Sequence, residues 1–165
     1  MTTASDPLQL MRALRGGGRS IRQDTAPADG QPLYVGYDDV DIHSPDGQHQ
    51  TQWVFEAEPP HGDSLHQVWL DGQQLPGRYW GRGHAWSTDS AGVVYCTLER
   101  YEDRASTLYL VRVADRSWLQ VGTHGAAVSL APPTLTFRSY GAPDSDAPQT
   151  LTLTGRERFV PIPAA

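Results

Sequence analysis

The densest group of potentially reactive side chains lies at residues 38–43, which read Asp-Asp-Val-Asp-Ile-His. If this stretch is a strand, alternate side chains point to one face, so Asp39, Asp41 and His43 would lie together. Two carboxylates and an imidazole can bind a divalent metal ion. Acidic residues are also common on a solvated strand at the edge of a sheet, where they discourage pairing with another chain. We favour the second interpretation and predict no bound metal and no cofactor.

Other catalytic arrangements are not recognisable in the sequence. The chain has no Gly-x-Ser-x-Gly motif, which positions the nucleophile of many hydrolases. Glu56 and Glu99 could form a glycosidase pair only if their carboxylates came within about 5 to 10 Å of each other, and a structural role is the simpler interpretation. The single cysteine, Cys96, lies in an apolar stretch and is expected to pack as a small hydrophobic residue. We therefore predict that the protein is not an enzyme.

The chain contains a repeated unit. Residues 44–70 align without a gap with residues 87–113, at an offset of 43 residues. Five identical pairs are superimposed by this alignment: Ser44/Ser87, Asp46/Asp89, Glu56/Glu99, Leu65/Leu108 and Val68/Val111. A fixed period of about 20 to 50 residues is typical of folds built from repeated supersecondary units. The sequence therefore predicts an architecture more clearly than a chemistry.

Each unit has the composition of a β-hairpin. A turn rich in Ser and Asp precedes a stretch of aromatic and β-branched residues, a polar connection and a second such stretch. Asp71-Gly72 predicts a two-residue turn that continues the first hairpin into a meander. The predicted strands are residues 33–37, 40–42, 51–57 with 65–70, 93–98 with 108–113, and, in a looser third copy, 134–137 with 151–154.

Residues 84–90 read His-Ala-Trp-Ser-Thr-Asp-Ser and precede the strands predicted at 93–98 and 108–113. This arrangement resembles one blade of a TolB-type or WD40-like β-propeller, and the resemblance covers residues 40–122. Propellers close with about four to eight blades, so three short units cannot form the ring or its central channel. We therefore predict an all-β fold: an antiparallel meander of about three 43-residue units that forms a sandwich or an open, curled sheet.

The N-terminal residues have a different pattern. Residues 6–15 are predicted to form a short helix, with Ser5 as N-cap and Pro7 in the first turn. Residues 16–30 are glycine-rich at their start and are expected to be a flexible linker. The predicted organisation is thus a helix and linker at residues 1–30 and a single β domain at 31–165. The segment lacks the uninterrupted apolar run of a signal peptide, and no stretch is long enough to span a membrane, so we expect a cytoplasmic protein.

The chain has a formal net charge of −6, which disfavours nucleic acid as a partner and favours a basic protein surface. Acidic residues cluster near aromatic ones, and aromatic side chains often supply much of the binding energy at protein interfaces. Four tryptophans, Trp53, Trp69, Trp86 and Trp118, are expected in the core instead. The predicted partner-binding residues are Tyr37, Asp38, Asp39, Asp41, Tyr79, Trp80, Glu99, Tyr101, Glu102 and Asp103, with Tyr34 as a further aromatic candidate.

A compact, acidic chain without catalytic motifs is similar in general character to small bacterial immunity proteins. That resemblance implies a protein that binds and neutralises a toxin domain. Two alternatives remain open: a carbohydrate- or small-ligand-binding β module that stacks its ligand on Tyr79 and Trp80, and a metal-dependent enzyme that uses Asp39, Asp41 and His43.

Overall fold

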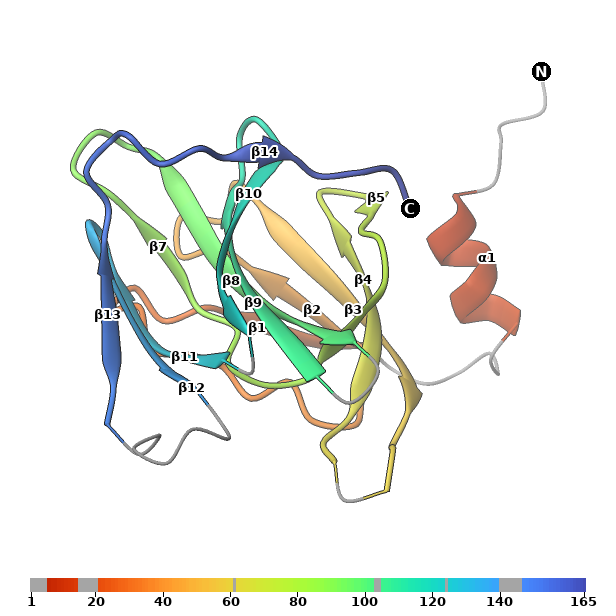
Figure 1. Ribbon diagram of the computed structural model, residues 1–165. Helices are drawn as coiled ribbons and strands as arrows, with labels where there is room; N and C mark the ends of the chain where they lie inside the picture. The colour runs from red at the N-terminus through yellow and green to blue at the C-terminus, as the bar shows by residue number, and fades with distance from the viewer. Residues whose placement is uncertain (1–5, 15–20, 61, 103–104, 124, 140–146) are drawn as a thin grey trace.

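The computed structural model describes residues 6–14, 21–60, 62–102, 105–123, 125–139 and 147–165. Strands account for most of this part of the chain, and a short helix precedes them (Figure 1). In order, the elements are α1 (Pro7–Leu14), β1 (Arg22–Thr25), β2 (Val40–His43), β3 (Gln50–Ala57), β4 (Leu65–Leu70), β5 (Gln73–Gln74), β6 (Arg78–Trp80), β7 (Trp86–Thr88), β8 (Val94–Glu102), β9 (Ala105–Arg112), β10 (Ser117–Thr123), β11 (Gly125–Ala131), β12 (Thr134–Ser139), β13 (Gln149–Thr152) and β14 (Val160–Pro161).

The strands form two sheets. The larger has 11 strands in the order β1-β2-β3-β4-β6-β8-β9-β10-β14, with β5 paired to β4 and β7 paired to β8. The smaller contains β11, β12 and β13. Within the described residues, the two end strands of the larger sheet do not pair with each other, so this sheet is open. The prediction of an all-β meander in an open sheet is confirmed.

The repeat is visible in the strand register. β3 and β4 form one antiparallel pair, in which Trp53 lies opposite Val68. β8 and β9 form the second, in which Cys96 lies opposite Val111, and both residues follow their counterparts by 43 positions. The third predicted hairpin also forms, as β12 with β13, but it belongs to the smaller sheet. The Asp71-Gly72 turn connects β4 and β5 as predicted, with positive φ at both residues, which glycine adopts readily.

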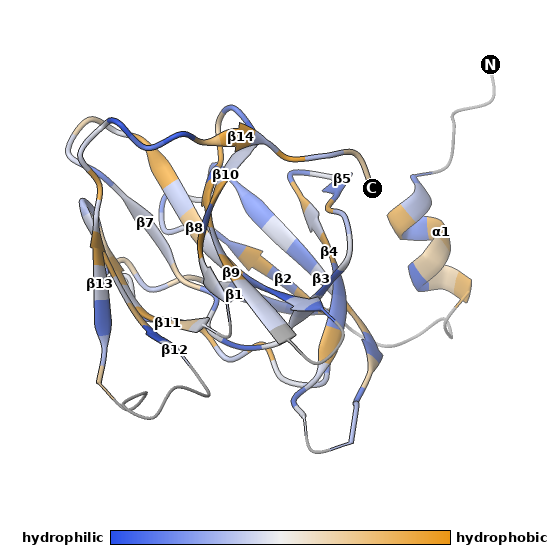
Figure 2. Ribbon diagram, in the orientation of Figure 1, coloured by the Kyte–Doolittle hydropathy of each residue, from blue (hydrophilic) through white to orange (hydrophobic). Residues whose placement is uncertain are grey.

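The larger sheet curls around the main hydrophobic core (Figure 1). Alternating hydrophobic and hydrophilic positions along its strands supply this core, as Figure 2 shows for β2 and β8. The four tryptophans predicted to be internal are all buried. A second core, which contains Leu108, Leu110, Leu130, Leu135 and Phe137, joins the outer side of β8 and β9 to the smaller sheet.

Helix α1 packs on the outside of the larger sheet, where Leu8 and Met11 contact Val54 and Trp69. The helix begins at Pro7, and the Asp6 carboxylate accepts a hydrogen bond from the Leu8 amide at 3.0 Å. Asp6 is therefore the N-cap residue of the helix. Ser5, for which this role was predicted, and Arg15 lie outside the described residues. Leu10 and Leu14 are exposed, at 53% and 78%.

Part of the predicted linker is instead integrated into the fold. β1 pairs in parallel with β2, from Arg22 opposite Val40 to Thr25 opposite His43. Farther along, Gly30 accepts a hydrogen bond from the Leu130 amide at 2.9 Å, and a Cβ on Gly30 would collide with the Leu130 carbonyl. The linker prediction is therefore wrong for these residues. A strand was also predicted at 33–37, where the structure has only an isolated bridge between Leu33 and His84.

Candidate functional site: an exposed aromatic strip

A continuous set of side-chain contacts joins three aromatic residues that come from separate parts of the chain. The Tyr34 hydroxyl donates to Asp63 at 3.0 Å, and Asp63 lies 4.0 Å from the Arg82 guanidinium. Arg82 lies 4.9 Å from the Trp80 ring, which in turn makes an edge contact with Tyr101 at 5.4 Å. Together with the neighbouring Tyr37, we call this set the tyrosine strip: Tyr34, Tyr37, Asp63, Trp80, Arg82 and Tyr101.

Two tyrosines dominate the exposed part of the strip. Tyr34 is 58% exposed and Tyr37 is 43% exposed. The hydrogen bond to Asp63 is the largest of several effects that raise the pKa of Tyr34 to about 12, and the Tyr37 hydroxyl contributes a smaller part. Tyr34 is therefore a neutral hydrogen-bonding phenol at physiological pH. Tyr37 rests on Phe55, with ring centroids 6.1 Å apart.

Backbone contacts fix the loop that carries both tyrosines. The Val35 amide donates to the Gly81 carbonyl and the Gly81 amide donates to the Ser64 carbonyl, both at 2.8 Å. The Ser64 hydroxyl donates to the Gly36 carbonyl. A Cβ on Gly81 would overlap the Ser64 hydroxyl and press on the Gly36 carbonyl, so the close approach of these three segments requires glycine. The tyrosines are thus presented on a loop held by the ends of β4 and β6.

Buried charge supports the other half of the strip. Arg82 donates from Nε and Nη2 to the two carboxylate oxygens of Glu99, both at 3.0 Å, and the Glu99 side chain is fully enclosed. A two-point ion pair of this kind fixes the plane of the guanidinium. It holds Arg82 over the Trp80 ring, where the positive charge is attracted to the π face.

Three of the predicted partner-binding residues are not on the surface. Tyr79 is fully buried in the main core, and its hydroxyl donates to the Pro76 carbonyl at 2.6 Å. Glu99 is the buried partner of Arg82, and Asp41 is buried beneath α1, where Arg12 donates to it at 2.7 Å. The prediction is wrong for these residues because Tyr79 packs into the main core and the two carboxylates are enclosed with arginines distant in sequence. A stacking platform of Tyr79 and Trp80 is excluded for the same reason.

The other predicted residues have varied positions. Tyr37 and Asp38 are exposed, and the Asp38 carboxylate is 3.7 Å from Arg22. Trp80 and Tyr101 are half-buried in the strip, and Glu102 is exposed at the end of β8. Asp103 lies outside the described residues. The strip also includes Asp63 and Arg82, which the sequence prediction missed because no local pattern distinguishes them from ordinary surface charges.

The candidate metal ligands do not form a site. The Asp39 carboxylate accepts a hydrogen bond from the Phe55 amide at 2.9 Å, and Asp41 is bonded to both Arg12 and Gln23. The His43 ring is 3.0 Å from the Gln23 side-chain oxygen. Across the described part of the chain, no three His, Cys, Asp or Glu side chains are grouped to hold a metal ion. These three residues instead connect β1, β2, β3 and α1.

Arginines balance some of the acidic charge around the strip. Arg78 lies 3.1 Å from Glu56, and Arg22 lies 2.9 Å from Asp24. Asp38, which is 3.7 Å from Arg22, is exposed just before β2, and Glu58 and Glu102 are exposed at the ends of β3 and β8. Asp38 and Glu102 directly follow the strip residues Tyr37 and Tyr101 in the sequence, so acidic residues adjoin the strip.

Comparisons with protein-family models, with curated proteins and with solved structures found no match to this chain. Among the described residues, the structure contains no helix with the length and apolar character needed to cross a membrane.

Proposed function

We propose that this chain is a non-enzymatic binding protein that neutralises a basic protein partner, and that the tyrosine strip is its contact surface. The observation that supports this proposal most directly is the exposure of Tyr34 and Tyr37 on a rigid loop beside Trp80 and Tyr101. Tyr and Trp are enriched among the residues that contribute most to interface affinity. Their rigid rings provide contact area at a small cost in conformational entropy.

The partner is proposed to be basic because the chain has a net charge of −6 and the strip has acidic side chains at its margin. Opposite charge across an interface accelerates association and selects the partner. A toxin domain blocked by this surface is the partner class we favour, since small acidic immunity proteins have this general character. A cytoplasmic location in a bacterial cell is part of the same proposal.

The test uses the full chain as bait in a lysate of its native host. We expect a basic protein to be retained in stoichiometric amount, and more weakly at high salt, because salt screens exposed charges. The variant Tyr34→Ala/Tyr37→Ala should lose it. Leu14→Ala is the control, because Leu14 is a hydrophobic residue on α1 that is even more exposed than the two tyrosines. Both variants should retain the wild-type fold.

A second assay tests neutralisation. The captured protein is expressed in a bacterial host with either the wild-type chain or the double tyrosine variant. Growth rescued by the wild type and lost with the variant supports the proposal. If the double variant retains the partner as well as the wild type does, the strip is not the contact surface. A partner that does not impair growth would refute the neutralising role.

A further inference from the structure

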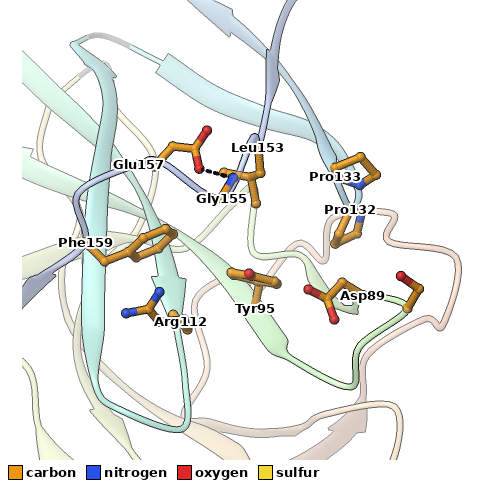
Figure 3. Close-up of a pocket in the computed structure, with 10 residues that line it drawn as sticks. Asp89, Tyr95, Arg112, Pro132, Pro133, Leu153, Gly155, Glu157 and Phe159 are labelled. Carbon is orange, nitrogen blue, oxygen red and sulfur yellow. Dashed lines mark hydrogen bonds between the residues drawn. The ribbon is translucent and has the colours of Figure 1, made fainter.

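A cleft lies between the two sheets, and its lining shares no residue with the tyrosine strip. It has a volume of about 270 Å³. The turn before β8 forms one side, β8 and β9 form the floor, and residues 153–159 pass over the top (Figure 3). The Leu153 amide donates to the Pro133 carbonyl at 2.7 Å, which attaches this C-terminal segment to the turn between β11 and β12. We call this space the C-terminal cleft.

Rings and apolar side chains form the walls of the cleft. Tyr95 and Phe159 lie with ring centroids 6.2 Å apart, and Pro132, Pro133 and Leu153 line the opposite side. Figure 3 shows the Tyr95 ring at the centre of the floor. Small-ligand sites typically have volumes of roughly 300–1,000 Å³ and apolar walls with a few polar groups. This cleft is slightly smaller, so its ligand must be a small molecule.

The charged groups of the cleft are unequally satisfied. The Glu157 carboxylate accepts hydrogen bonds from the Thr154 and Gly155 amides at 2.6 and 3.0 Å. The Arg112 guanidinium is paired with Asp115 at 2.6 Å and lies over the Phe159 ring. Both groups therefore already have partners within the protein.

Asp89 is different. One of its carboxylate oxygens, Oδ1, accepts from the Ala91 and Val93 amides, both at 2.9 Å. Within the described residues, no hydrogen bond or ion pair engages the other oxygen, and no basic side chain is paired with Asp89. Burial is the main effect that raises the pKa of the Tyr95 phenol, and the negative charge of Asp89 raises it further. The cleft therefore has an available carboxylate beside an aromatic ring.

We propose that the C-terminal cleft binds a small organic cation: a primary amine on a flat, apolar body. The ammonium group is recognised by the free oxygen of Asp89. The body lies over Tyr95 and against Pro132 and Leu153, where it removes apolar surface from water. A cation near an aromatic face gains further attraction from the ring. This site is separate from the tyrosine strip and does not depend on the function proposed for it.

Three probes of similar size and different charge test the proposal on the full chain. They are 2-phenylethylamine, 2-phenylethanol and 3-phenylpropanoate, each titrated into ¹⁵N-labelled protein and followed by amide chemical shifts. We expect the amine to bind about tenfold more tightly than the alcohol, because hydrogen bonds between ionised groups are about twice as strong as neutral ones. The shifts should occur at cleft residues such as Tyr95, Gly155 and Phe159, and the carboxylate should not bind.

Asp89→Asn tests the assigned role of the carboxylate. Asparagine keeps the oxygen that accepts from Ala91 and Val93, so the turn should be preserved. The amine affinity should fall about tenfold, to that of the alcohol, whereas the alcohol affinity should not change. Asp46→Asn is the matched control, because Asp46 occupies the same position in the first repeat, where it accepts from Ser44 and Gln48 outside the cleft. Tyr95→Leu should weaken the amine and the alcohol alike.

Three results would overturn the proposal. One is the absence of shifts at cleft residues with millimolar amine. Another is binding of the carboxylate as tightly as the amine. The third is an equal loss of amine affinity in the Asp46→Asn and Asp89→Asn variants.

Discussion

His84 allows a quantitative test of the core. It is 1% exposed and lies between Trp53 and Trp86. Its Nδ1 is 2.7 Å from the Thr97 carbonyl, and its Nε2 is 2.7 Å from the Trp86 indole nitrogen. A carbonyl can only accept and an indole N–H can only donate, so the proton of neutral His84 is on Nδ1. Protonation of Nε2 would break the bond from Trp86 and place a charge in the core.

Burial accordingly lowers the pKa of His84 from 6.5 to about 4. The unfolded chain therefore binds a proton at higher pH than the folded chain does. Above pH 6.5 both states are neutral, and this histidine makes no pH-dependent contribution. As the pH falls from about 6.5 to 4, stability is lost progressively. The difference between the two pKa values corresponds to a loss of about 3 kcal/mol at pH 4.

Urea unfolding at a series of pH values, followed by tryptophan fluorescence, measures this loss. Other groups also titrate in this range. Burial lowers the pKa of His66, and hydrogen bonds lower the pKa of Asp46 and Asp115. The informative quantity is therefore the difference between the wild type and His84→Gln. Glutamine can place an acceptor near Nε2 but does not titrate. His43→Gln, at the half-buried end of β2, is the control.

The free energy of unfolding of His84→Gln should be lower than that of the wild type at pH 7, and the gap should close by about 3 kcal/mol by pH 4. Comparison with the control separates the effect of removing His84 from the effect of removing any imidazole. NMR titration of the wild-type imidazole is an independent measurement, in which Nδ1 should stay protonated and Nε2 unprotonated above pH 5. A constant gap between wild type and His84→Gln, or an imidazole that titrates near 6.5, would refute the reasoning.

Three further predictions concern other buried groups. The thiol of Cys96 is fully buried and its pKa is raised by desolvation, so it should not react with a disulfide reagent in the native protein and should react once urea unfolds the chain. Trp86→Ala should lower the free energy of unfolding by about 3–5 kcal/mol, measured by urea unfolding, because it empties a completely enclosed position; near-normal stability would contradict that burial. Glu99→Ala should cost about 1–3 kcal/mol because it removes the two charge-assisted hydrogen bonds from Arg82, which remains near Asp63 and partly exposed to solvent, whereas Glu102→Ala, at an exposed position, should change stability by less than about 0.5 kcal/mol.

Features that depend on neighbours in the sequence were predictable. The Asp71-Gly72 turn needs two residues that tolerate positive φ, and the sequence supplies them next to strands of β-branched and aromatic residues. The hairpins of the first two units follow from their stretches of β-branched and aromatic residues. Equivalent residue pairs in the two hairpins are related by the 43-residue offset. The short helix also follows from local signals, although Asp6 provides the cap.

Features that depend on distant partners were not predictable. Glu99 looks like an exposed strand-end acid in the sequence, and only the approach of Arg82 makes it a buried ion pair. β1 has a polar sequence with no strand pattern, but the exposed edge of β2 provides a hydrogen-bonding partner for it. The tyrosine strip was only partly predicted for the same reason. Tyr34 and Asp63 are 29 residues apart, and the contact between the loop and the strand ends brings them together.

Equivalent positions of the two repeated units contribute to the two candidate sites in different ways. Tyr37 and Trp80 are 43 residues apart, so one position of the unit supplies an aromatic residue to the strip twice. Asp46 and Asp89 are also equivalent, and each stabilises its own turn through backbone amides. Asp89 lines the C-terminal cleft, where residues 153–159 pass over the second unit. The duplicated hairpins therefore provide the framework, and the segments outside them, at residues 33–37 and 153–159, complete the two proposed sites.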